Sequence, residues 1–563
     1  MQKAASYVSG TSDAPLLGMT IGEALDRARL QWGEREALVS PSHGVRLNWR
    51  EFADQVDAVA AGFLALGLER GDRIGIWSLN RPEWTVTQFA AAKAGLILVT
   101  INPAYRLNEL EFALGKVGCS ALVTATTFKT SNYLEMVNAL APELSRCAPG
   151  ELKAPKLPKL RTVIQIGGPK QPGTIAFEEV AGMGRDRHRE MLAGLSKSLQ
   201  FDDPINIQFT SGTTGSPKGV MLTHHNILNN GYFVGRAMAL TERDRMCIPV
   251  PLYHCFGMVM GNLTAVTHGA AMILPGEGFD PLVTLTTVEQ EKCTTLYGVP
   301  TMFIAELEHP DFSRFVLKSL RTGIMAGAPC PIEVMRRVID KMNMRDVTIA
   351  YGMTETSPVS FQTGMSDSVE RRVSTVGRVH PHSEVKVVDL EGKVVARGET
   401  GELCTRGYSV MLGYWDEPQK TAEVLDDGGW MHTGDLATID DEGYGNIVGR
   451  IKDMVIRGGE NLYPREIEEY LYRHPKVQDA QVFGVADDRY GEELCAWIRV
   501  KPGETLTAED VRAFCQGQIA HNKIPRYIEF VAEFPMTVTG KVQKFIMRDV
   551  VEQKLGLKRV KTA

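Results

Sequence analysis

Hydrophobic and polar positions alternate along the first half of the chain in a pattern that predicts strands and helices in turn. Short apolar runs have the length and composition of buried strands, at 72–78, 96–101 and 120–124. Two stretches between them are predicted to be helices, at 83–94 and 107–117. The second of these aligns apolar residues on one helix face: Leu110, Ala113, Leu114 and Val117. This alternation predicts parallel sheets covered by helices.

The same rhythm returns between residues 244 and 351, so we expect a large α/β body built from two similar layered lobes. One segment of this region, 255–274, is apolar enough to suggest a membrane span. It is interrupted by glycines and by polar residues that include Asn262, Thr264 and His268. We therefore expect a buried helix followed by a buried strand, and no transmembrane segment.

The pattern changes after about Gly377, where short β-like runs between glycine-rich turns predict a β-rich subdomain. A boundary is expected near 449–453, and beyond it the pattern predicts a small α+β unit. That unit should contain helices at 465–473 and 507–520 and strands at 478–485, 495–500 and 527–531. We accordingly divide the chain into an N-terminal domain (1–449), a hinge (450–454) and a C-terminal α+β domain (455–563).

Composition and charge argue against several classes of protein. The 563 residues are 44% hydrophobic and 23% charged, which is typical of a globular protein with several packed units. A net charge of −6 gives no support for binding nucleic acid. Nine scattered cysteines without a CxxC pair predict neither a zinc site nor a disulfide framework, and Cys255, Cys330 and Cys404 are expected to be small buried residues. A reduced, cytoplasmic setting fits best, and the N-terminus lacks the apolar core of a secretion signal.

The segment FTSGTTGSPKG, residues 209–219, has the composition of a phosphate-binding loop. Its backbone amides, its hydroxyl groups and Lys218 could surround phosphate oxygens. It is not a P-loop, because Pro217 stands where that motif has glycine and Gly219 stands where it has the hydroxyl residue that binds magnesium. A P-loop kinase or ATPase is therefore disfavoured, and a mobile surface turn is the alternative.

Together with the VMLTH that follows it, this loop resembles the phosphate loop of the adenylate-forming (AMP-binding) superfamily, which includes acyl-CoA synthetases, peptide-synthetase adenylation domains and beetle luciferases. Other motifs of that superfamily follow in its order: PLYH at 251–254, GAP at 327–329, YGMTE at 351–355, TGD at 433–435, GRIKD at 449–453 and TGK at 539–541. The resemblance covers nearly the whole chain. It implies an N-terminal AMP-binding domain followed by a small, mobile C-terminal domain.

The resemblance also implies a two-step reaction. A carboxylic acid attacks the α-phosphate of ATP, pyrophosphate leaves, and a thiol such as that of CoA then displaces AMP. The first transition state spreads negative charge over phosphate oxygens, so it needs hydrogen-bond donors, a cation and Mg²⁺ more than a general base. The implied ligands are thus ATP, Mg²⁺, CoA and a small-molecule carboxylic acid.

Each motif takes a role by this resemblance. Thr354 would donate a hydrogen bond to the α-phosphate, and Glu355 would help to hold Mg²⁺. Lys541 would be the catalytic lysine that stabilises charge between the carboxylate and the α-phosphate. The β- and γ-phosphates would be gripped by the loop residues Thr210, Ser211, Gly212, Thr213, Thr214, Gly215, Ser216, Pro217 and Lys218.

The nucleoside would be held by the later motifs. Tyr351 would pack on the adenine, and a buried core tyrosine is compatible with the same position. Asp435 would accept hydrogen bonds from the ribose hydroxyls, and Arg450 would support the same ribose. The backbone segments beside the nucleotide would be those of Gly327, Ala328, Pro329, Gly352 and Met353.

A geometric conflict accounts for the hinge, because Lys541 must reach the site for the first step and leave it for the second. The resemblance implies that the C-terminal domain rotates at Lys452 between the two steps. It would then present a CoA-binding loop with Arg457, Gly458 and Gly459, whose glycines would let the pantetheine arm pass close to the backbone. A rigid tight turn is the alternative for the two glycines.

The identity of the acid is less well defined by the sequence. The acyl pocket is expected to include His254, Phe256, Gly257, Tyr297, Val299 and Met302, and a core histidine remains an alternative for the first. These residues are neutral and mostly apolar, and no aspartate is placed to receive an amino group, which argues against an amino-acid-activating domain. SLNRPEW at 78–84, NPAY at 102–105 and IRGGEN at 456–461 look most like the medium-chain fatty acyl-CoA synthetase branch.

Several alternatives stay open at this point. The acid could be an aryl or a short branched-chain acid, and the acceptor could be the thiol of a carrier protein instead of CoA. A catalytically inactive binding module is disfavoured because Glu355, Asp435, Arg450 and Lys541 are all present. The sequence also leaves a homo-oligomer open.

Overall fold

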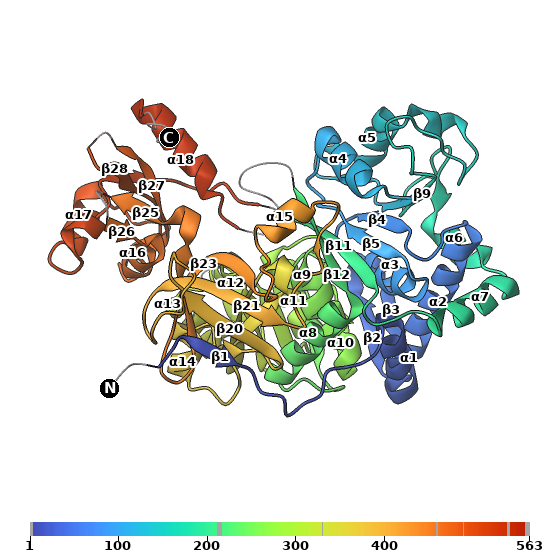
Figure 1. Ribbon diagram of the computed structural model, residues 1–563, viewed down its shortest axis with the longest axis horizontal. Coiled ribbons are helices and arrows are strands. Elements are labelled where there is room, and N and C mark those ends of the chain that lie inside the picture. The colour runs from blue at the N-terminus through green and yellow to red at the C-terminus, as the bar shows by residue number, and fades with distance from the viewer. Residues whose placement is uncertain are drawn as a thin grey trace.

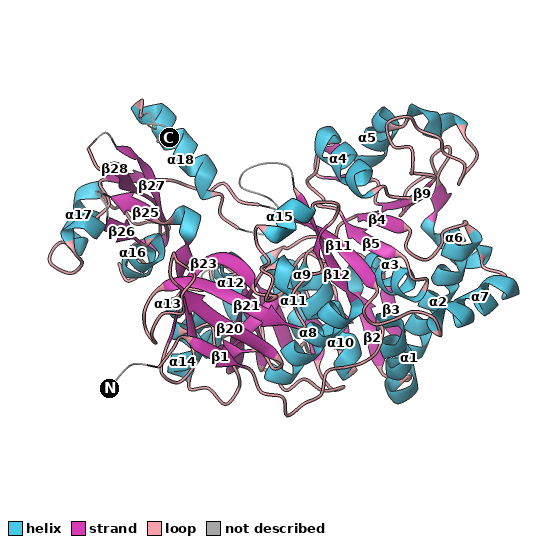
Figure 2. Cartoon of the chain, viewed as in Figure 1, coloured by secondary structure: helices cyan, strands magenta, loops and turns pink. Residues whose placement is uncertain are grey.

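The protein is described by a computed structural model that covers residues 4–210, 217–328, 330–457, 460–487, 489–537 and 541–557. Two large α/β layers and a β-rich region form the body, and the C-terminal unit projects from it at the upper left of Figure 1. Figure 2 shows helices covering the sheets of the body. The predicted fold class, a layered α/β body with a β-rich region and a small α+β C-terminal unit, is confirmed.

The first large sheet has the strand order β10-β9-β6-β4-β5-β11-β12-β22. Parallel pairing joins its central strands, β4 (Arg73–Trp77), β5 (Ile97–Thr100), β6 (Ala121–Thr124), β9 (Thr162–Gln165) and β11 (Pro204–Thr210). β12 (Lys218–Thr223) runs antiparallel beside β11, so the two strands form a hairpin. The strands predicted at 72–78, 96–101 and 120–124 correspond to β4, β5 and β6.

Helix α3 (Pro82–Lys93) shows how the two large sheets share one core. It is buried around almost its whole circumference, because it contacts β4 and β5 of the first sheet and β2 (Glu36–Ser40) of the second. A helix in such a position needs no polar stripe. Helix α4 (Leu107–Val117) has the predicted bounds, and the apolar face predicted for it is the face that it buries.

The second large sheet has the strand order β19-β18-β17-β16-β15-β13-β14-β2-β3. Parallel pairing joins β2, β14 (Ala271–Ile273), β13 (Arg245–Cys247), β15 (Thr295–Gly298), β16 (Thr322–Ala326) and β17 (Asp346–Gly352). The carboxyl ends of these strands therefore lie along the same edge of the sheet, which is where open α/β sheets bind their ligands.

The apolar segment 255–274 is buried as predicted. It forms α9 (Cys255–Gly257), a π-helical segment at Met258–Leu263, α10 (Thr264–His268) and then the central strand β14. Several of its polar groups have partners inside the body; the Asn262 amide N–H, for example, donates to Gln88 Oε1 at 2.8 Å. In the part of the chain that the structure describes, no helix has the length and apolar character needed to cross a membrane.

The β-rich region is an antiparallel sheet in the order β1-β20-β21-β23-β24. Its strands are β1 (Tyr7–Ser9), β20 (Ser383–Val388), β21 (Gly401–Gly407), β23 (Met431–Ile439) and β24 (Gly445–Arg450). The N-terminal strand β1 was not predicted, since three residues carry too short a pattern. It pairs with β20, which lies near the other end of the body in the sequence.

The C-terminal unit contains β25 (Val455–Arg457), β26 (Glu460–Leu462), α16 (Pro464–Leu471), β27 (Val477–Asp487), β28 (Gly491–Val500), α17 (Ala508–Cys515), β29 (Tyr527–Phe530) and α18 (Lys544–Leu555). The helix predicted at 507–520 is wrong in its C-terminal part, because α17 ends at Cys515. Gln516 is extended and Gly517 has a φ of +73°, so the chain leaves the helix at this point. The division of the chain at 449–455 into independent domains stays a prediction.

Candidate active site

The candidate site lies at the carboxyl ends of β15, β16 and β17, where three of the predicted segments meet. Val299 follows β15, Gly327 and Ala328 follow β16, and Gly352 ends β17. The register places these ends side by side, since Gly298 is opposite Met325 and Ala326 is opposite Ala350. Gly327 has a φ of +84°, a left-handed conformation that favours glycine. Pro329 lies outside the described residues.

The predicted phosphate loop connects β11 to β12. Thr210, the last residue of β11, is directly opposite Lys218, the first residue of β12, so the two flank the mouth of the hairpin. Pro217 immediately precedes β12. The residues between them, Ser211, Gly212, Thr213, Thr214, Gly215 and Ser216, lie outside the described residues, and their phosphate contacts stay a prediction.

Tyr414 links this hairpin to the YGMTE motif, and sequence reasoning missed it. The short strand β22 (Gly413–Tyr414) pairs with β12, and the Lys218 ammonium lies 4.6 Å from the centre of the Tyr414 ring. The Tyr414 hydroxyl donates a hydrogen bond to Glu355 Oε1 at 3.0 Å. The only signal in the sequence was the GYW at 413–415, which acquires its role through a strand pairing that local pattern does not reveal.

Glu355 and Thr354 sit in a single 3₁₀ turn, Thr354–Thr356, directly after β17, and both are buried. Burial raises the pKa of the Glu355 carboxyl, and the Tyr414 hydroxyl together with the charges of Lys218 and Lys541 opposes that rise. The Glu355 carboxylate supplies the type of oxygen donor that Mg²⁺ prefers. The structure thus brings Glu355, Lys218 and Lys541 into one electrostatic neighbourhood.

The three residues predicted to hold the nucleoside are also together. The Tyr351 hydroxyl donates to Asp435 Oδ2 at 2.6 Å, and Arg450 Nε lies 3.4 Å from Asp435 Oδ1. Asp435 on β23 and Arg450 on β24 are direct cross-strand partners, so the sheet itself sets their distance. Burial raises the pKa of Asp435, and the charge of Arg450 opposes the rise. The arrangement offers an aromatic face, a carboxylate and a guanidinium at one place.

Lys541 reaches this place from the C-terminal unit. Met536 and Val542 form an antiparallel bridge, and residues 538–540 between them lie outside the described residues. The Lys541 N–H donates to Thr537 Oγ1 at 3.0 Å, which fixes the backbone of the lysine. Burial and the charge of Arg450 lower the pKa of Lys541, whereas the carboxylates of Asp435 and Glu355 raise it. The C-terminal unit therefore holds its lysine close to the residues predicted to bind the nucleotide.

His254 precedes α9 and faces the same neighbourhood. Its Nδ1 accepts a hydrogen bond from the Phe256 backbone N–H at 3.2 Å, so the side chain caps the helix. Burial, followed by the charge of Lys541, lowers the pKa of His254 to about 3, and the ring is neutral at physiological pH. His254 therefore fits both interpretations. Its Nδ1 has a hydrogen-bond partner, as expected of a core histidine, and its ring is also close enough to Lys541 to be affected by that charge.

Four of the six residues predicted for the acyl pocket, Phe256, Tyr297, Val299 and Met302, belong to the large hydrophobic core of the body. The rings of Phe256 and Tyr297 stack with their centres 5.7 Å apart. At Gly257 a Cβ would lie 2.4 Å from the Pro251 carbonyl oxygen, so only glycine fits there. Met353, beside Thr354, packs against the same cluster. These side chains are thus part of the hydrophobic core beside the turn that carries Thr354, and a pocket for the acid stays a prediction.

The hinge and CoA-loop residues are placed as follows. Lys452 lies in the 3₁₀ turn Ile451–Asp453, which connects β24 of the body to β25 of the C-terminal unit. Arg457 Nε donates to Glu493 Oε1 at 2.7 Å, and its guanidinium stacks 4.2 Å from the Tyr490 ring centre. Both partners belong to the C-terminal unit. Gly458 and Gly459 lie outside the described residues, and the binding of CoA here stays a prediction.

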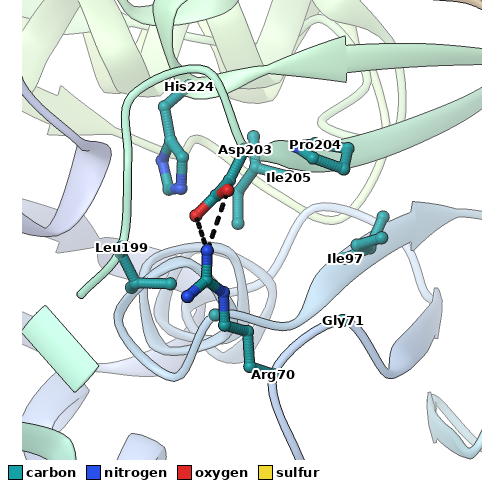
Figure 3. A pocket seen from close by; sticks show the side chains of 9 residues that line it. Arg70, Gly71, Ile97, Leu199, Asp203, Pro204, Ile205 and His224 are labelled. Atoms are coloured by element: carbon teal, nitrogen blue, oxygen red, sulfur yellow. Dashed lines mark hydrogen bonds and ion pairs between the residues drawn. The ribbon is translucent and has the colours of Figure 1, made fainter.

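A separate small cavity of about 60 Å³ lies at the opposite, amino-terminal end of β5 and β11. Figure 3 shows Arg70 pointing toward Asp203 at this cavity, and its guanidinium donates to both Asp203 oxygens at 2.9 and 2.7 Å. A cavity of this size has room for about two water molecules but not for a nucleotide. It is therefore not a competing substrate site.

Comparison with known proteins agrees with this geometry. Residues 25–415 match the family profile described as AMP-binding enzyme, and residues 466–541 match the AMP-binding enzyme C-terminal domain. The chain is 49% identical to the medium-chain acyl-CoA ligase ACSF2, mitochondrial, of Danio rerio, over 98% of this chain and 91% of that protein. It is also 49% identical to the putative acyl-CoA synthetase YngI of Bacillus subtilis (strain 168), over 95% of this chain and 98% of that protein.

Solved structures with the same arrangement share less of the sequence. The anthranilate CoA ligase AuaEII in complex with anthranoyl-AMP is 27% identical, with a TM-score of 0.85 over 97% of this chain and 99% of that one. ATP-bound MatB from Rhodopseudomonas palustris is 28% identical, with a TM-score of 0.79 over 95% of this chain and 100% of that one.

Proposed function

We propose that this chain, which belongs to the family of AMP-binding enzymes, is an ATP-dependent acyl-CoA ligase that activates a medium-chain fatty acid. The observation that carries the proposal is the convergence of Lys541, Glu355 and the Tyr351–Asp435–Arg450 group at the carboxyl ends of the second sheet. These residues supply the charges that acyl-adenylate formation needs, and an apolar cluster adjoins them.

In the first half-reaction the carboxylate of the acid attacks the α-phosphate, forming the acyl–phosphate bond as the bond to pyrophosphate breaks. Asp435 and Tyr351 would hold the ribose and adenine, and their hydrogen bond to each other fixes both side chains in advance. Lys218 would pair with the departing pyrophosphate. The Lys541 ammonium, near both Asp435 and Glu355, would stabilise the charge that develops between the carboxylate and the phosphate.

Glu355 fits the requirements of a magnesium ligand. Its carboxylate is buried at the end of β17 beside Lys218, and the hydrogen bond from Tyr414 fixes its orientation. Mg²⁺ prefers hard oxygen donors such as carboxylates and phosphates, and when bound it neutralises part of the phosphate charge. Thr354, in the same turn, would donate its hydroxyl to the α-phosphate.

In the second half-reaction the CoA thiolate attacks the acyl carbonyl and AMP leaves. In this proposal Lys541 must leave the site before the thiol can approach, so the C-terminal unit would rotate at Lys452, in the turn Ile451–Asp453, between the steps. Arg457 would then move with that unit and bring the 457–461 loop to the pantetheine arm. A carrier-protein thiol is the alternative acceptor.

The medium-chain acid is favoured by two observations. The ACSF2 relatives, which cover nearly the whole chain, carry that substrate in their names, and four of the predicted pocket residues are uncharged members of the hydrophobic core. An aryl acid is the second candidate, because the anthranilate ligase shares the fold at 27% identity and the stacked Phe256–Tyr297 pair would accept a flat ring.

The test is a screen of acids of graded length, from acetate to palmitate, together with benzoate and isovalerate, each with ATP, Mg²⁺ and CoA. We expect AMP and pyrophosphate as products and the highest kcat/KM with octanoate or decanoate. Production of ADP would refute the reaction class, whereas a maximum with benzoate or isovalerate would refute only the substrate assignment.

The cellular location is a separate part of the proposal. We favour the cytoplasm, where all nine free cysteines would stay reduced. The animal relatives are named mitochondrial, so cell fractionation with a compartment marker is the deciding measurement.

A further inference from the structure

A group of three metal-type side chains lies on the β-rich sheet, apart from the residues that would bind ATP. Cys404 on β21 and His432 on β23 are direct cross-strand partners, and Glu402 is two residues before Cys404 on the same strand. Among the residues that the structure describes, they form the only set of three or more such side chains whose ligand atoms converge, all within 4.8 Å of one another.

The distances within the group are close to those of a coordination site. His432 Nδ1 lies 3.5 Å from Cys404 Sγ and 2.9 Å from Glu402 Oε2. A tetrahedral Zn²⁺ ion with its usual bond lengths places a sulfur and a nitrogen ligand about 3.6 Å apart, and a nitrogen and an oxygen ligand about 3.3 Å apart. The histidine and cysteine thus already have the required separation, and the glutamate would have to withdraw by about half an ångström.

We propose that Glu402, Cys404 and His432 form a binding site for a transition-metal ion of the Zn²⁺ class. The donor set of one sulfur, one imidazole nitrogen and one carboxylate oxygen favours such an ion over Mg²⁺, which prefers oxygen ligands. Three protein ligands leave a fourth position for water. The site does not depend on the proposed function, because its ligands are not assigned to substrate binding.

The surroundings show how an ion would enter and what it must displace. Cys404 is fully buried with Trp430 and Val388, whereas the side chains of His432 and Glu402 keep 33% and 22% of their surface exposed, so entry is from their side. Binding of the ion by the Cys404 thiol breaks the S–H bond, forms the S–metal bond and releases that proton to the buffer.

The site is connected to the nucleotide residues through Glu402. Its other carboxylate oxygen, Oε1, accepts a hydrogen bond from the Gly434 N–H at 3.1 Å, and the next residue is Asp435. An ion that moves Glu402 from its present position would weaken that hydrogen bond and shift the part of β23 that carries Asp435. Occupation of the site is therefore expected to weaken ATP binding.

Cobalt provides the direct test, because Co²⁺ reports a thiolate ligand by a charge-transfer absorption in the near ultraviolet. The untagged full chain, treated with chelator, should bind one Co²⁺ with this band, and Zn²⁺ but not excess Mg²⁺ should remove it. Cys404→Ser should lose the band, and Cys147→Ser, at a cysteine elsewhere in the fold, should keep it. Absence of the band, or an equal band in Cys404→Ser, would overturn the proposal.

Glu402→Gln provides a second variant in case Cys404→Ser does not fold. It keeps the shape of the side chain and should weaken Co²⁺ binding at least about tenfold while retaining the thiolate band. Unchanged affinity would show that Glu402 is not a ligand.

The connection to the nucleotide is measured by titration calorimetry with ATP. Zn²⁺ should raise the Kd for ATP of wild type and not that of Cys404→Ser. If Zn²⁺ raised the Kd for ATP of both proteins equally, its effect would come from another site. This conclusion does not depend on which reaction the protein catalyses.

Discussion

At the scale of single residues, Lys541 is expected to act in the first half-reaction and not in the second. Lys541→Ala removes the ammonium near Asp435 and Glu355. Acyl-adenylate formation should fall by about 10²–10³-fold, the usual loss when a group that stabilises transition-state charge is removed. Thioester formation from a supplied acyl-adenylate should be largely retained, because that step needs the lysine to leave. Pyrophosphate exchange measures the first step, and transfer to CoA from the purified acyl-adenylate measures the second.

Lys554→Ala is the matched control for this experiment. Lys554 lies in α18 of the same unit, is mostly exposed and pairs with Glu529 on the surface, so both half-reactions should be unchanged. An equal loss of both half-reactions in Lys541→Ala would contradict the assignment.

The sequence predicted single residues well where a motif is contiguous, and poorly where a role arises from pairing between distant strands. Asp435 and Arg450 were both found in motifs, and the structure adds that they face each other across two strands. Tyr414 was missed, because its contact with Glu355 spans 59 positions and depends on the β12–β22 pairing. The Cys404–His432 pair, 28 positions apart, was hidden for the same reason.

At the scale of elements, periodicity predicted the helices and strands that bury one clear face. α4 has the predicted bounds, because its apolar face and its C-terminal Gly118 define both its orientation and its end. The helix predicted at 507–520 was too long, since apolar spacing continues to Ile519 although the backbone has already left the helix at Gln516. Backbone conformation, which the apolar pattern does not encode, ended that element.

Two glycine substitutions should have opposite effects on stability. A Cβ at Gly352, at the end of β17, would lie 1.7 Å from the Pro358 carbonyl oxygen, so Gly352→Ala must push apart the β17–β18 pair. We expect a loss of more than about 3 kcal/mol, in the range of strongly disruptive core changes. Gly115→Ala, on α4 with nothing within 4 Å, should instead gain about 0.5–1 kcal/mol.

Urea unfolding of both variants beside wild type measures these changes. Stability of Gly352→Ala equal to that of wild type would mean that the turn before Thr354 is free to move, contrary to its close packing.

The turn Ile451–Asp453 is the element on which the second half-reaction depends in our proposal. Lys452→Pro fixes φ at that residue and restricts Ile451 as well, so rotation between β24 and β25 should be hindered. We expect thioester formation to fall at least about tenfold more than pyrophosphate exchange, provided that the turn can still adopt the arrangement seen here. Lys452→Ala keeps the backbone free and should affect the two steps equally; the same pattern in Lys452→Pro would argue against the hinge.

At the scale of the whole molecule, the site is assembled from parts of the chain that are far apart. The hairpin β11–β12 comes from the first sheet, Glu355 from the second, Asp435 from the β-rich sheet and Lys541 from the C-terminal unit. The sequence predicted the order of these parts, but their convergence follows from packing, in particular from α3 between the two large sheets. The alternation of strand and helix patterns along the sequence does not specify which two sheets pack against the same helix.

The same packing makes stability depend on pH through buried histidines. Burial lowers the pKa of His224 and His268 to about 4 and that of His254 and His380 to about 3, against about 6.5 in an unfolded chain. Below pH 6.5 the unfolded state therefore binds protons that the folded state does not. Their stabilising contribution is complete above pH 6.5 and is lost as the pH falls toward 4 for the first two and toward 3 for the other two, by up to about 1.4 kcal/mol per histidine and pH unit.

A single variant isolates this effect, because buried carboxyls with raised pKa, such as Glu355, act in the opposite direction and change the total slope. His380 is fully buried and its Nε2 pairs with Gln362 Oε1 at 3.0 Å, a hydrogen bond that a glutamine amide can replace. Between pH 6.5 and 5 the unfolding free energy of His380→Gln should fall less steeply than that of wild type, by about 1 kcal/mol per pH unit. His521→Gln, at an exposed position, should keep the wild-type slope. Urea unfolding at half-unit pH intervals measures the three slopes, and parallel lines for all three proteins would show that His380 is not held neutral by the fold.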